Sequence, residues 1–288
     1  MILREKKTGQ LKKMSAYYET AKIRELVEEN YRVRSFVLDK GVAAEPGQFV
    51  MVWVPRFDEK PMCVVNDAPL TLSVANVGPF TQKLFELKQG DLLSFRGPLG
   101  NCFSLEGKGG KKFGKILLAG GGYGVAALNF LAKKARQEGI EVTMVVAARR
   151  KEDLILEKEF FDKGVKVFVS TDDGSAGFKG RAHELVEKLL AEEGEGNKGK
   201  EGRGYDGLYA CGPEKMMEAL AKTSKKHGLP SQLSLERYMG CGLGVCAKCD
   251  CGGKLVCAEG PVFSGEEALQ LAEFGETHRD TMGHKHDW

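Results

Sequence analysis

The sequence predicts a multidomain protein of β and α/β class, with an antiparallel barrel, a Rossmann-like nucleotide domain and a small C-terminal cysteine domain. Short apolar runs separated by turn residues fill the first third of the chain. A glycine-rich turn joins a strand to a helix in the middle, and cysteines crowd one loop near the end. The predicted divisions are an arm (1–15), the barrel (16–110), the nucleotide domain (111–232), the cysteine domain (233–268) and a tail (269–288).

Composition narrows the class of protein. The 43 basic and 40 acidic residues leave a net charge of +3, so we expect no nucleic-acid partner. The basic segment Met1 to Lys13 has no apolar core behind it, which predicts a disordered arm and no export signal. No stretch approaches the roughly 20 apolar residues of a membrane span. We therefore expect a cytoplasmic protein with reduced thiols and no membrane contact.

The barrel is predicted from short strands at regular spacing, each bounded by Gly, Pro or Asp. Gly90-Asp91 precedes the last of them, and the run Arg96 to Gly100 is expected to close the barrel. The strand runs are Tyr31 to Leu38, Phe49 to Val54, Leu70 to Val77 and Leu92 to Phe95.

The nucleotide domain is predicted from a strand, turn, helix and strand in succession. These are the apolar run Ile116 to Ala119, the turn Gly120 to Gly124, the helical pattern Val125 to Glu138 and the strand Glu141 to Ala148. The alternation continues through Val165 to Ser170, Ala182 to Leu190 and Leu208 to Ala210. Between the last two, Glu192 to Gly204 is rich in Gly, Glu and Lys and predicts a surface loop.

Three loops at strand ends are candidate nucleotide contacts. The amides of Gly120, Gly121, Gly122 and Gly124 precede a helix, so they can hold a pyrophosphate that any Cβ would block. In Thr171 to Ser175, Asp172 and Asp173 either bind a ribose or cap a turn. In the third loop, Cys211 precedes Gly212 and Pro213 and lies either near a bound nicotinamide or in the core as a small thiol.

The cysteine spacing carries the most specific chemistry. Cys241, Cys246, Cys249 and Cys257 form a C-x4-C-x2-C pattern with a distal fourth cysteine, which is typical of a 2Fe-2S cluster. Structural zinc usually takes two separated knuckles, and a disulfide scaffold is not expected in a long chain without a secretory signal. Cys251 lies outside the pattern, as a loop thiol or a substitute ligand.

The C-terminal region carries weaker signals. Gly252-Gly253 predicts a hairpin turn that returns Cys257 to the other ligands, and Ser264 to Glu273 predicts a short helix. The residues beyond are polar and are expected to be loosely held. His284 and His286 favour a solvated tail over a metal site, because two histidines on a flexible end leave a site open.

Together these features resemble the ferredoxin-reductase superfamily and, more closely, the electron-transfer subunits of type B dihydroorotate dehydrogenase, from about Ala16 to Phe263. The motifs that carry the resemblance are Pro46-Gly47-Gln48-Phe49, Gly97-Pro98-Leu99-Gly100-Asn101, Gly120 to Val125, Thr171 to Ser175, Cys211-Gly212-Pro213, Glu236 to Cys249 and Cys257 to Phe263.

The resemblance implies an FAD in the barrel. Lys60 to Cys63 and Asp67 to Thr71 compete for the family's Arg-x-Tyr-Ser-like segment, and we prefer the first, which leaves room for a return strand before the phosphate loop Gly78 to Thr81. Lys60 replaces a bidentate Arg, and Cys63 replaces a hydroxyl expected near the flavin N5. The implied FAD contacts are Lys60, Pro61, Met62, Cys63, Ser73, Val74, Ala75, Phe80 and Thr81.

The implied function is an oxidoreductase relay in pyrimidine biosynthesis. Electrons leave dihydroorotate at the FMN of a separate catalytic subunit, cross the 2Fe-2S cluster to FAD and reduce NAD(P), in a heterotetramer of two subunits of each kind. A flavin is needed because nicotinamide exchanges a hydride and the cluster single electrons.

Several alternatives stay open at the level of sequence. Gamma-type subunits of soluble hydrogenases share the implied architecture, as do the small subunits of sulfide dehydrogenase or transhydrogenase. The transhydrogenase type has Asp at the first cluster position, so Cys241 argues against it. A zinc-binding adaptor is the alternative from another class. Arg149-Arg150 either bind the 2′-phosphate of NADP or are solvated.

Overall fold

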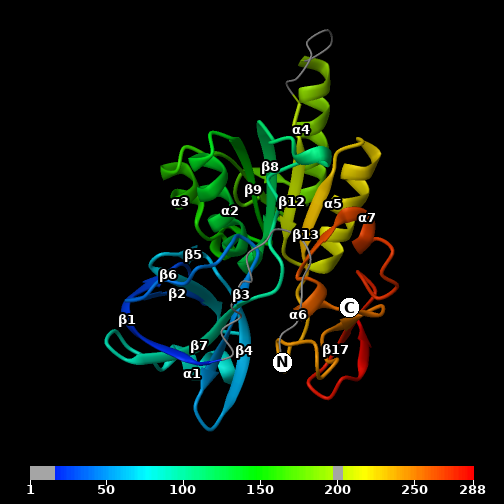
Figure 1. Ribbon diagram of the computed structural model, residues 1–288. Coiled ribbons are helices and arrows are strands. Elements are labelled where there is room, and N and C mark those ends of the chain that lie inside the picture. Colours follow the sequence, from blue (N-terminus) through cyan, green and yellow to red (C-terminus); the bar gives the residue numbers. More distant parts are fainter. Residues whose placement is uncertain (1–16, 197–203) are drawn as a thin grey trace.

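The computed structural model describes residues 17–196 and 204–288. Figure 1 shows an antiparallel sheet at lower left, an α/β layer above it, and the C-terminal segment at lower right. The predicted arm and part of the predicted loop 192–204 lie outside the described residues. Among the described helices, none is long and apolar enough to span a membrane.

The N-terminal half is a seven-stranded antiparallel sheet with the strand order β4-β3-β7-β1-β2-β6-β5. One helix, α1 (Pro79–Phe85), follows β6. Buried apolar side chains of β2, β3, β6 and α1 share one core, which includes Phe36, Val50, Leu72 and Leu84. The strands are β1 (Glu19–Glu28), β2 (Val33–Leu38), β3 (Phe49–Val54), β4 (Asp58–Cys63), β5 (Asn66–Asp67), β6 (Leu70–Ala75) and β7 (Leu92–Leu99).

The four predicted strand runs of this half are confirmed in position, but three strands, β1, β4 and the two-residue β5, were not predicted. β1 is charged and mostly exposed, and β4 lies at the sheet edge with every side chain partly or fully exposed, so neither shows an apolar run. The run Arg96 to Leu99, which was predicted to close the barrel, continues β7 and pairs with β3. Closure of the sheet into a barrel stays a prediction.

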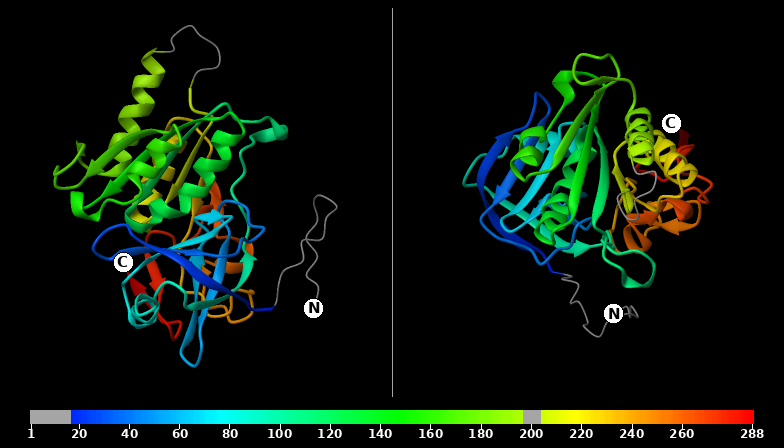
Figure 2. Two further views of the ribbon diagram at one scale, coloured as in Figure 1. Left: turned by 90° about the vertical axis from the view of Figure 1, so that its left-hand side faces the viewer. Right: turned by 90° about the horizontal axis from the view of Figure 1, so that it is seen from above.

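The second half is an α/β sheet with the strand order β11-β10-β9-β8-β12-β13-β16, in which only β16 runs antiparallel to its neighbour. Ile116 and Leu118 of β8 pack toward α2, while Leu117 and Ala119 pack with residues of α4 and α5. Figure 2 shows these helices on opposite sides of the sheet. The strands are β8 (Lys115–Gly121), β9 (Glu141–Ala148), β10 (Lys166–Thr171), β11 (Phe178–Lys179), β12 (Gly207–Cys211), β13 (Ser231–Ser234) and β16 (Val262–Ser264).

The helices of this half are α2 (Val125–Gln137), α3 (Glu157–Asp162), α4 (Ala182–Gly196) and α5 (Glu214–Lys226), with short 3-10 turns η1 (Lys108–Gly110), η2 (Gly122–Gly124) and η3 (Lys151–Asp153). The α/β class predicted from the sequence is confirmed. The sequence did not predict α3. α4 runs on to Gly196, so the predicted loop that begins at Glu192 is helical over its first residues.

The C-terminal segment leaves the α/β sheet at β13 and returns to it at β16. Between them lie β14 (Asp250–Cys251), β15 (Lys254–Leu255) and α6 (Val256–Glu259), and after them α7 (Gly265–Ala268), β17 (Thr277–Arg279) and β18 (Lys285–Asp287). β14 and β15 form the hairpin predicted at Gly252-Gly253. The helix predicted over Ser264 to Glu273 is only one turn long, with Ser264 as its cap.

The prediction of a loosely held tail is wrong, because the tail forms a hairpin. The indole of Trp288 donates to Glu214 at 3.2 Å, and Lys248 donates to the Thr281 carbonyl at 2.8 Å. His284 and His286 both lie against Asp280, at 3.5 and 3.1 Å. Such partners are distant in sequence or on a facing strand, so composition alone does not reveal them.

Candidate functional site

The loop after β13 directs backbone amides at cysteine sulfurs. The amides of Leu243, Val245 and Cys246 each lie 3.4 Å from the Cys241 sulfur. The amide of Gly244 donates to Cys257 at 3.2 Å, and the amide of Cys257 to Cys249 at 3.4 Å. Such donors stabilise thiolates and cluster sulfurs.

The four predicted ligands stand as two thiol pairs. Cys246 is hydrogen-bonded to Cys241, and Cys257 to Cys249. Burial raises the pKa of Cys241, but the amides outweigh this and lower it to about 7. The thiol of Cys257, which donates to Cys249, lowers the pKa of Cys249. Two pairs fit a two-iron cluster, since each iron takes two cysteine sulfurs.

Within residues 17–196 and 204–288, no three His, Cys, Asp or Glu side chains are placed to hold one metal ion. The predicted zinc alternative places four sulfurs around one point, whereas a 2Fe-2S cluster places two around each iron.

Cys251 is turned into the core instead of the cluster loop. It is fully buried, and its sulfur accepts a hydrogen bond from the Arg237 guanidinium at 3.1 Å. Arg237 in turn forms a buried ion pair with Glu214 on α5. The interpretation of Cys251 as a loop thiol is therefore wrong, because the alternating pleat of β14 points it inward.

The glycine-rich turn and the Cys-Gly-Pro loop lie back to back at the carboxyl edge of the α/β sheet. A Cβ on Gly124 would come within 2.6 Å of the Gly212 backbone, and a Cβ on Gly212 within 2.9 Å of the Gly121 backbone. A Cβ on Gly120 would lie 2.8 Å from the Val125 Cα. Glycine is thus required for packing here, and the same turn leads directly into α2.

The loop after β10 is organised by its second aspartate. Asp172 and Asp173 are both exposed, and Asp173 accepts hydrogen bonds from the amide and hydroxyl of Ser175, at 2.9 and 2.6 Å. After the neighbouring β9, Arg150 lies 3.7 Å from Asp153 and 4.0 Å from Glu152. The ends of β9 and β10 therefore carry exposed carboxylates close to an arginine that already has acidic partners.

Four side chains from four strand ends meet between the two sheets, and we call this group the junction: Cys63, Tyr123, Cys211 and Glu236. The Tyr123 hydroxyl donates to Glu236 at 3.4 Å. Tyr123 is 41% exposed, and Cys63 and Glu236 are also accessible to solvent, although they lie between two domains. Their accessibility at this place leaves polar groups available to a ligand.

The junction favours protonated groups. Desolvation, followed by the charge of Glu236, raises the pKa of the Cys63 thiol to about 12, although the residue as a whole is exposed. Desolvation also raises the pKa of Glu236, and the Glu236 charge raises that of Tyr123. Burial, then the charges of Cys63 and Glu236, raise the pKa of Cys211. The sequence indicated Cys63 and Cys211 but assigned no role to Tyr123 or Glu236, because their proximity arises only when the sheets pack.

The predicted flavin segment forms the edge strand β4. The Lys60 amine donates to the Tyr238 hydroxyl at 2.9 Å and lies 2.5 Å from Asp58. Cys63 pairs opposite Phe49 at the strand end, while Pro61 and Met62 are half-buried. Thr81 is buried and accepts hydrogen bonds from the amides of Val77 and Gly78, both at 3.0 Å. Lys60 therefore already contacts the cysteine segment through Tyr238.

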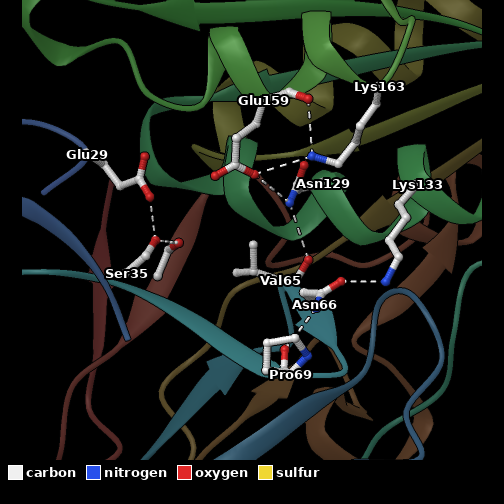
Figure 3. Close-up of polar contacts among 10 residues, drawn as sticks. Glu29, Ser35, Val65, Asn66, Pro69, Asn129, Lys133, Glu159 and Lys163 are labelled. Atoms are coloured by element: carbon white, nitrogen blue, oxygen red, sulfur yellow. Dashed lines mark hydrogen bonds and ion pairs between the residues drawn. The ribbon is translucent and has the colours of Figure 1, made fainter. Parts of the chain in front are cut away.

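The residues that follow β4 are fastened to α2, as Figure 3 shows. The Asn129 amide lies 3.5 Å from the Val65 carbonyl and 3.2 Å from Glu159, and Lys133 donates to Asn66 at 2.6 Å. On the adjacent β2, Ser35 lies 2.6 Å from Glu29 and 2.5 Å from Ser73, a predicted flavin contact. We call the contacts of Asn129 and Lys133 with Val65 and Asn66 the seam. The seam holds the end of β4 against the helix that begins at the glycine-rich turn.

This combination of an antiparallel sheet and an α/β sheet occurs in solved ferredoxin reductases and related oxidoreductases. The chain is 32% identical to the structure of an NADH-dependent reduced ferredoxin-NADP oxidoreductase, with a TM-score of 0.73 and coverage of 86% of this chain and 88% of that one. The ferredoxin reductase of carbazole 1,9a-dioxygenase shares the fold at 22% identity, with a TM-score of 0.60 and coverage of 74% and 66%. The fold is thus that of the ferredoxin-reductase-like oxidoreductases.

The sequence comparisons identify the family within that class. Residues 236–269 match the model of the iron-sulfur cluster binding domain of dihydroorotate dehydrogenase B. Proteins named probable dihydroorotate dehydrogenase B (NAD(+)), electron transfer subunit, are 39% identical in Methanocaldococcus jannaschii and 41% in Methanothermobacter thermautotrophicus. The alignments cover 92% and 94% of this chain and 96% and 97% of the relatives. The chain belongs to the family of dihydroorotate dehydrogenase B electron transfer subunits.

Proposed function

We propose that this chain carries electrons from a dihydroorotate-oxidising partner, through a 2Fe-2S cluster and an FAD, to NAD+. The overall reaction converts dihydroorotate and NAD+ into orotate, NADH and a proton, so the two electrons balance. The chain is the NAD-linked oxidoreductase subunit and relies on its partner for the oxidation of dihydroorotate. Its place in metabolism is pyrimidine biosynthesis, and its location is the cytoplasm.

One observation carries the proposal. The two thiol pairs lie directly against the sheet that bears the predicted flavin segment, because a Cβ on Gly242 would come within 3.0 Å of Met51 and 3.1 Å of Leu99. The positive φ of Gly242, 63°, places the loop in this contact. A cluster at the thiol pairs and a flavin at the junction would therefore be neighbours, as sequential electron transfer requires.

The chain's residues divide between three ligands. FAD lies in a barrel closed from the antiparallel sheet, with its ring near Cys63 and its pyrophosphate near Thr81. NAD lies on the paired glycine loops, with Asp172 and Asp173 at its ribose and Cys211, Gly212 and Pro213 at its nicotinamide. The cluster domain holds the 2Fe-2S cluster on Cys241, Cys246, Cys249 and Cys257. We favour NAD over NADP because acidic Glu152 and Asp153 already pair with Arg150.

A bound flavin supplies the exchange between a hydride and single electrons. The residues of this chain supply position and protonation. Gly120, Gly124 and Gly212 allow the nucleotide backbone to approach closely. Cys63, whose pKa is raised to about 12, presents a protonated thiol where hydride is exchanged, and burial raises the pKa of the nearby Glu236. The seam between β4 and α2 keeps the proposed FAD and NAD sites in a fixed relative position.

The partner is an FMN-containing dihydroorotate dehydrogenase catalytic subunit, in a heterotetramer of two copies of each. The cluster loop is the surface that meets it, because Val245 is 73% exposed and Leu243 39% exposed beside the solvent-exposed Cys246. Exposed apolar residues around a redox centre are suited to a protein interface.

The test is co-expression with the catalytic subunit, followed by purification and assay. The expected complex contains FAD, FMN and two iron atoms per chain, and it reduces NAD+ with dihydroorotate. A colourless chain loaded with zinc would contradict the proposal and support the adaptor hypothesis.

A second candidate is a diaphorase-type subunit of a soluble hydrogenase or a sulfide dehydrogenase. The chain shares its fold with an NADH-dependent reduced ferredoxin-NADP oxidoreductase, so the fold alone does not tie it to dihydroorotate. Reduction of NAD+ by hydrogen or sulfide, with no response to dihydroorotate, would decide for this candidate. The cofactors of the chain itself would be unchanged.

A further inference from the structure

The buried guanidinium of Arg96 connects the antiparallel sheet to the cysteine loop. Arg96 lies on β7 and is 7% exposed. Its Nε and Nη2 donate to the two carboxylate oxygens of Glu59, at 2.7 and 2.8 Å. Nη2 also donates to the backbone carbonyl of Cys241, at 2.7 Å. A single side chain thus binds the strand that bears the predicted flavin segment and the first of the predicted cluster ligands.

The geometry of this contact suits Arg and no other residue. The bidentate pair with Glu59 fixes the guanidinium plane, which leaves its third hydrogen bond aimed at Cys241. Glu59 is held further by the hydroxyl of Tyr18, at 2.9 Å. The remaining Nη1 is buried and has no hydrogen-bond partner in the described part of the chain. Glu59 balances the charge of Arg96, and the positive end of this ion pair lies against the Cys241 carbonyl.

We propose that Arg96 is a positioning residue that orients Cys241 and raises the reduction potential of the cluster bound there. This inference rests on the proposed function, because it assumes that the thiol pairs hold a 2Fe-2S cluster. Reduction adds one negative charge to the cluster. A guanidinium in a poorly solvated site beside a ligand stabilises that charge more strongly than an exposed cation would.

Lys60 and Gly242 also join the antiparallel sheet to the cysteine segment, but neither places a cation against a predicted cluster ligand. Lys60 donates to Tyr238, which is three positions before Cys241 and is not a predicted ligand. Gly242 contributes only close packing against Met51 and Leu99. Arg96 is therefore the contact through which the flavin sheet acts on a cluster ligand.

The chain contains a matched control on the same sheet. Arg34 on β2 donates through Nε to Glu28 at 2.6 Å and through Nη1 to the Phe85 carbonyl at 3.0 Å. It thus has a carboxylate and a backbone carbonyl as partners, as Arg96 does, but its carbonyl partner lies in α1 instead of the cysteine loop.

The experiment is a redox titration of the purified, cofactor-loaded chain monitored by electron paramagnetic resonance of the reduced cluster. Arg96→Gln should lower the ratio of reduced to oxidised cluster about tenfold at a fixed potential, which corresponds to about 59 mV for one electron. Arg96→Lys should recover part of the shift, because the charge remains without the fork. Arg34→Gln should leave the ratio unchanged.

The double variant Arg96→Gln with Glu59→Gln removes the charges without leaving a buried carboxylate unpaired, so it tests the proposal if the single variant does not fold. A lowered potential and a changed resonance line shape in this variant support the proposal. Loaded variants at Arg96 that match Arg34→Gln in both measurements overturn it and leave the proposed function intact. A wild-type chain without any cluster overturns the proposed function first.

Discussion

The cysteine loop and the junction are both redox sites by our proposal, yet they are assembled in different ways. In the loop, every sulfur and every amide donor belongs to the segment from Cys241 to Cys257. At the junction, Cys63, Tyr123, Cys211 and Glu236 come from four separate strand ends. A local site depends on its own turns, whereas an assembled site depends on how the sheets pack.

The largest expected effect is loss of the cluster. It should follow from substitution of the buried thiol Cys257 but not from substitution of the buried thiol Cys251. Cys257→Ser removes one member of a thiol pair, so the purified chain should lose the cluster's visible absorbance and its resonance signal. Cys251→Ser should keep both, and it should lower the free energy of unfolding by about 1–3 kcal/mol because a more polar hydroxyl replaces a fully buried thiol. Cluster loss in Cys251→Ser would contradict the ligand assignment.

A smaller but still severe effect is expected where the two nucleotide loops touch. In Gly124→Ala the added Cβ meets the Gly212 backbone at 2.6 Å, which should cost about 1–3 kcal/mol of unfolding free energy and weaken NADH binding. Chemical denaturation and NADH titration measure both. Gly204→Ala, whose Cβ would meet nothing within 4 Å, is the control and should stay within about 0.5 kcal/mol of wild type.

At the junction itself we expect a moderate change in rate. Cys63→Ser places a stronger hydrogen-bond donor at the proposed flavin site, so stopped-flow reduction of FAD by NADH should be about fivefold faster, the equivalent of about 1 kcal/mol. Because the pKa of the Cys63 thiol is raised to about 12, it stays protonated as the pH rises from about 6 to about 9. The ratio of the two rates should therefore be constant over this range. A ratio that changes with pH would show that Cys63 titrates there.

The smallest effect is expected at the seam in Figure 3. Lys133 contacts Asn66 at 2.6 Å and Asp67 at 3.1 Å, so Lys133→Met should cost about 1 kcal/mol in thermal or chemical unfolding. Lys83→Met removes an exposed ion pair with Glu86 within α1 and should cost only a few tenths of a kcal/mol. Equal costs would mean that the seam adds nothing beyond an ordinary surface pair.

Predictions from the sequence succeeded for local structure and failed for structure that depends on tertiary contacts. The strands β8, β9 and β12 are buried on both faces, and their continuous apolar runs made the α/β class predictable. The strands β1 and β4 are exposed and charged and gave no such signal. The C-terminal hairpin escaped prediction because Trp288 and Lys248 find their partners only in the folded chain.

By itself, the sequence determined the local chemistry: the spacing of four cysteines, the glycines that allow close backbone approach, and the order of strands and helices. Each of these depends on neighbours in the chain, where distance is set by covalent geometry. The tertiary structure alone decided that Cys251 faces Arg237, that Glu236 meets Tyr123, and that Arg96 reaches Cys241. Those contacts join residues far apart in sequence, and burial of the two apolar cores is what brings them together.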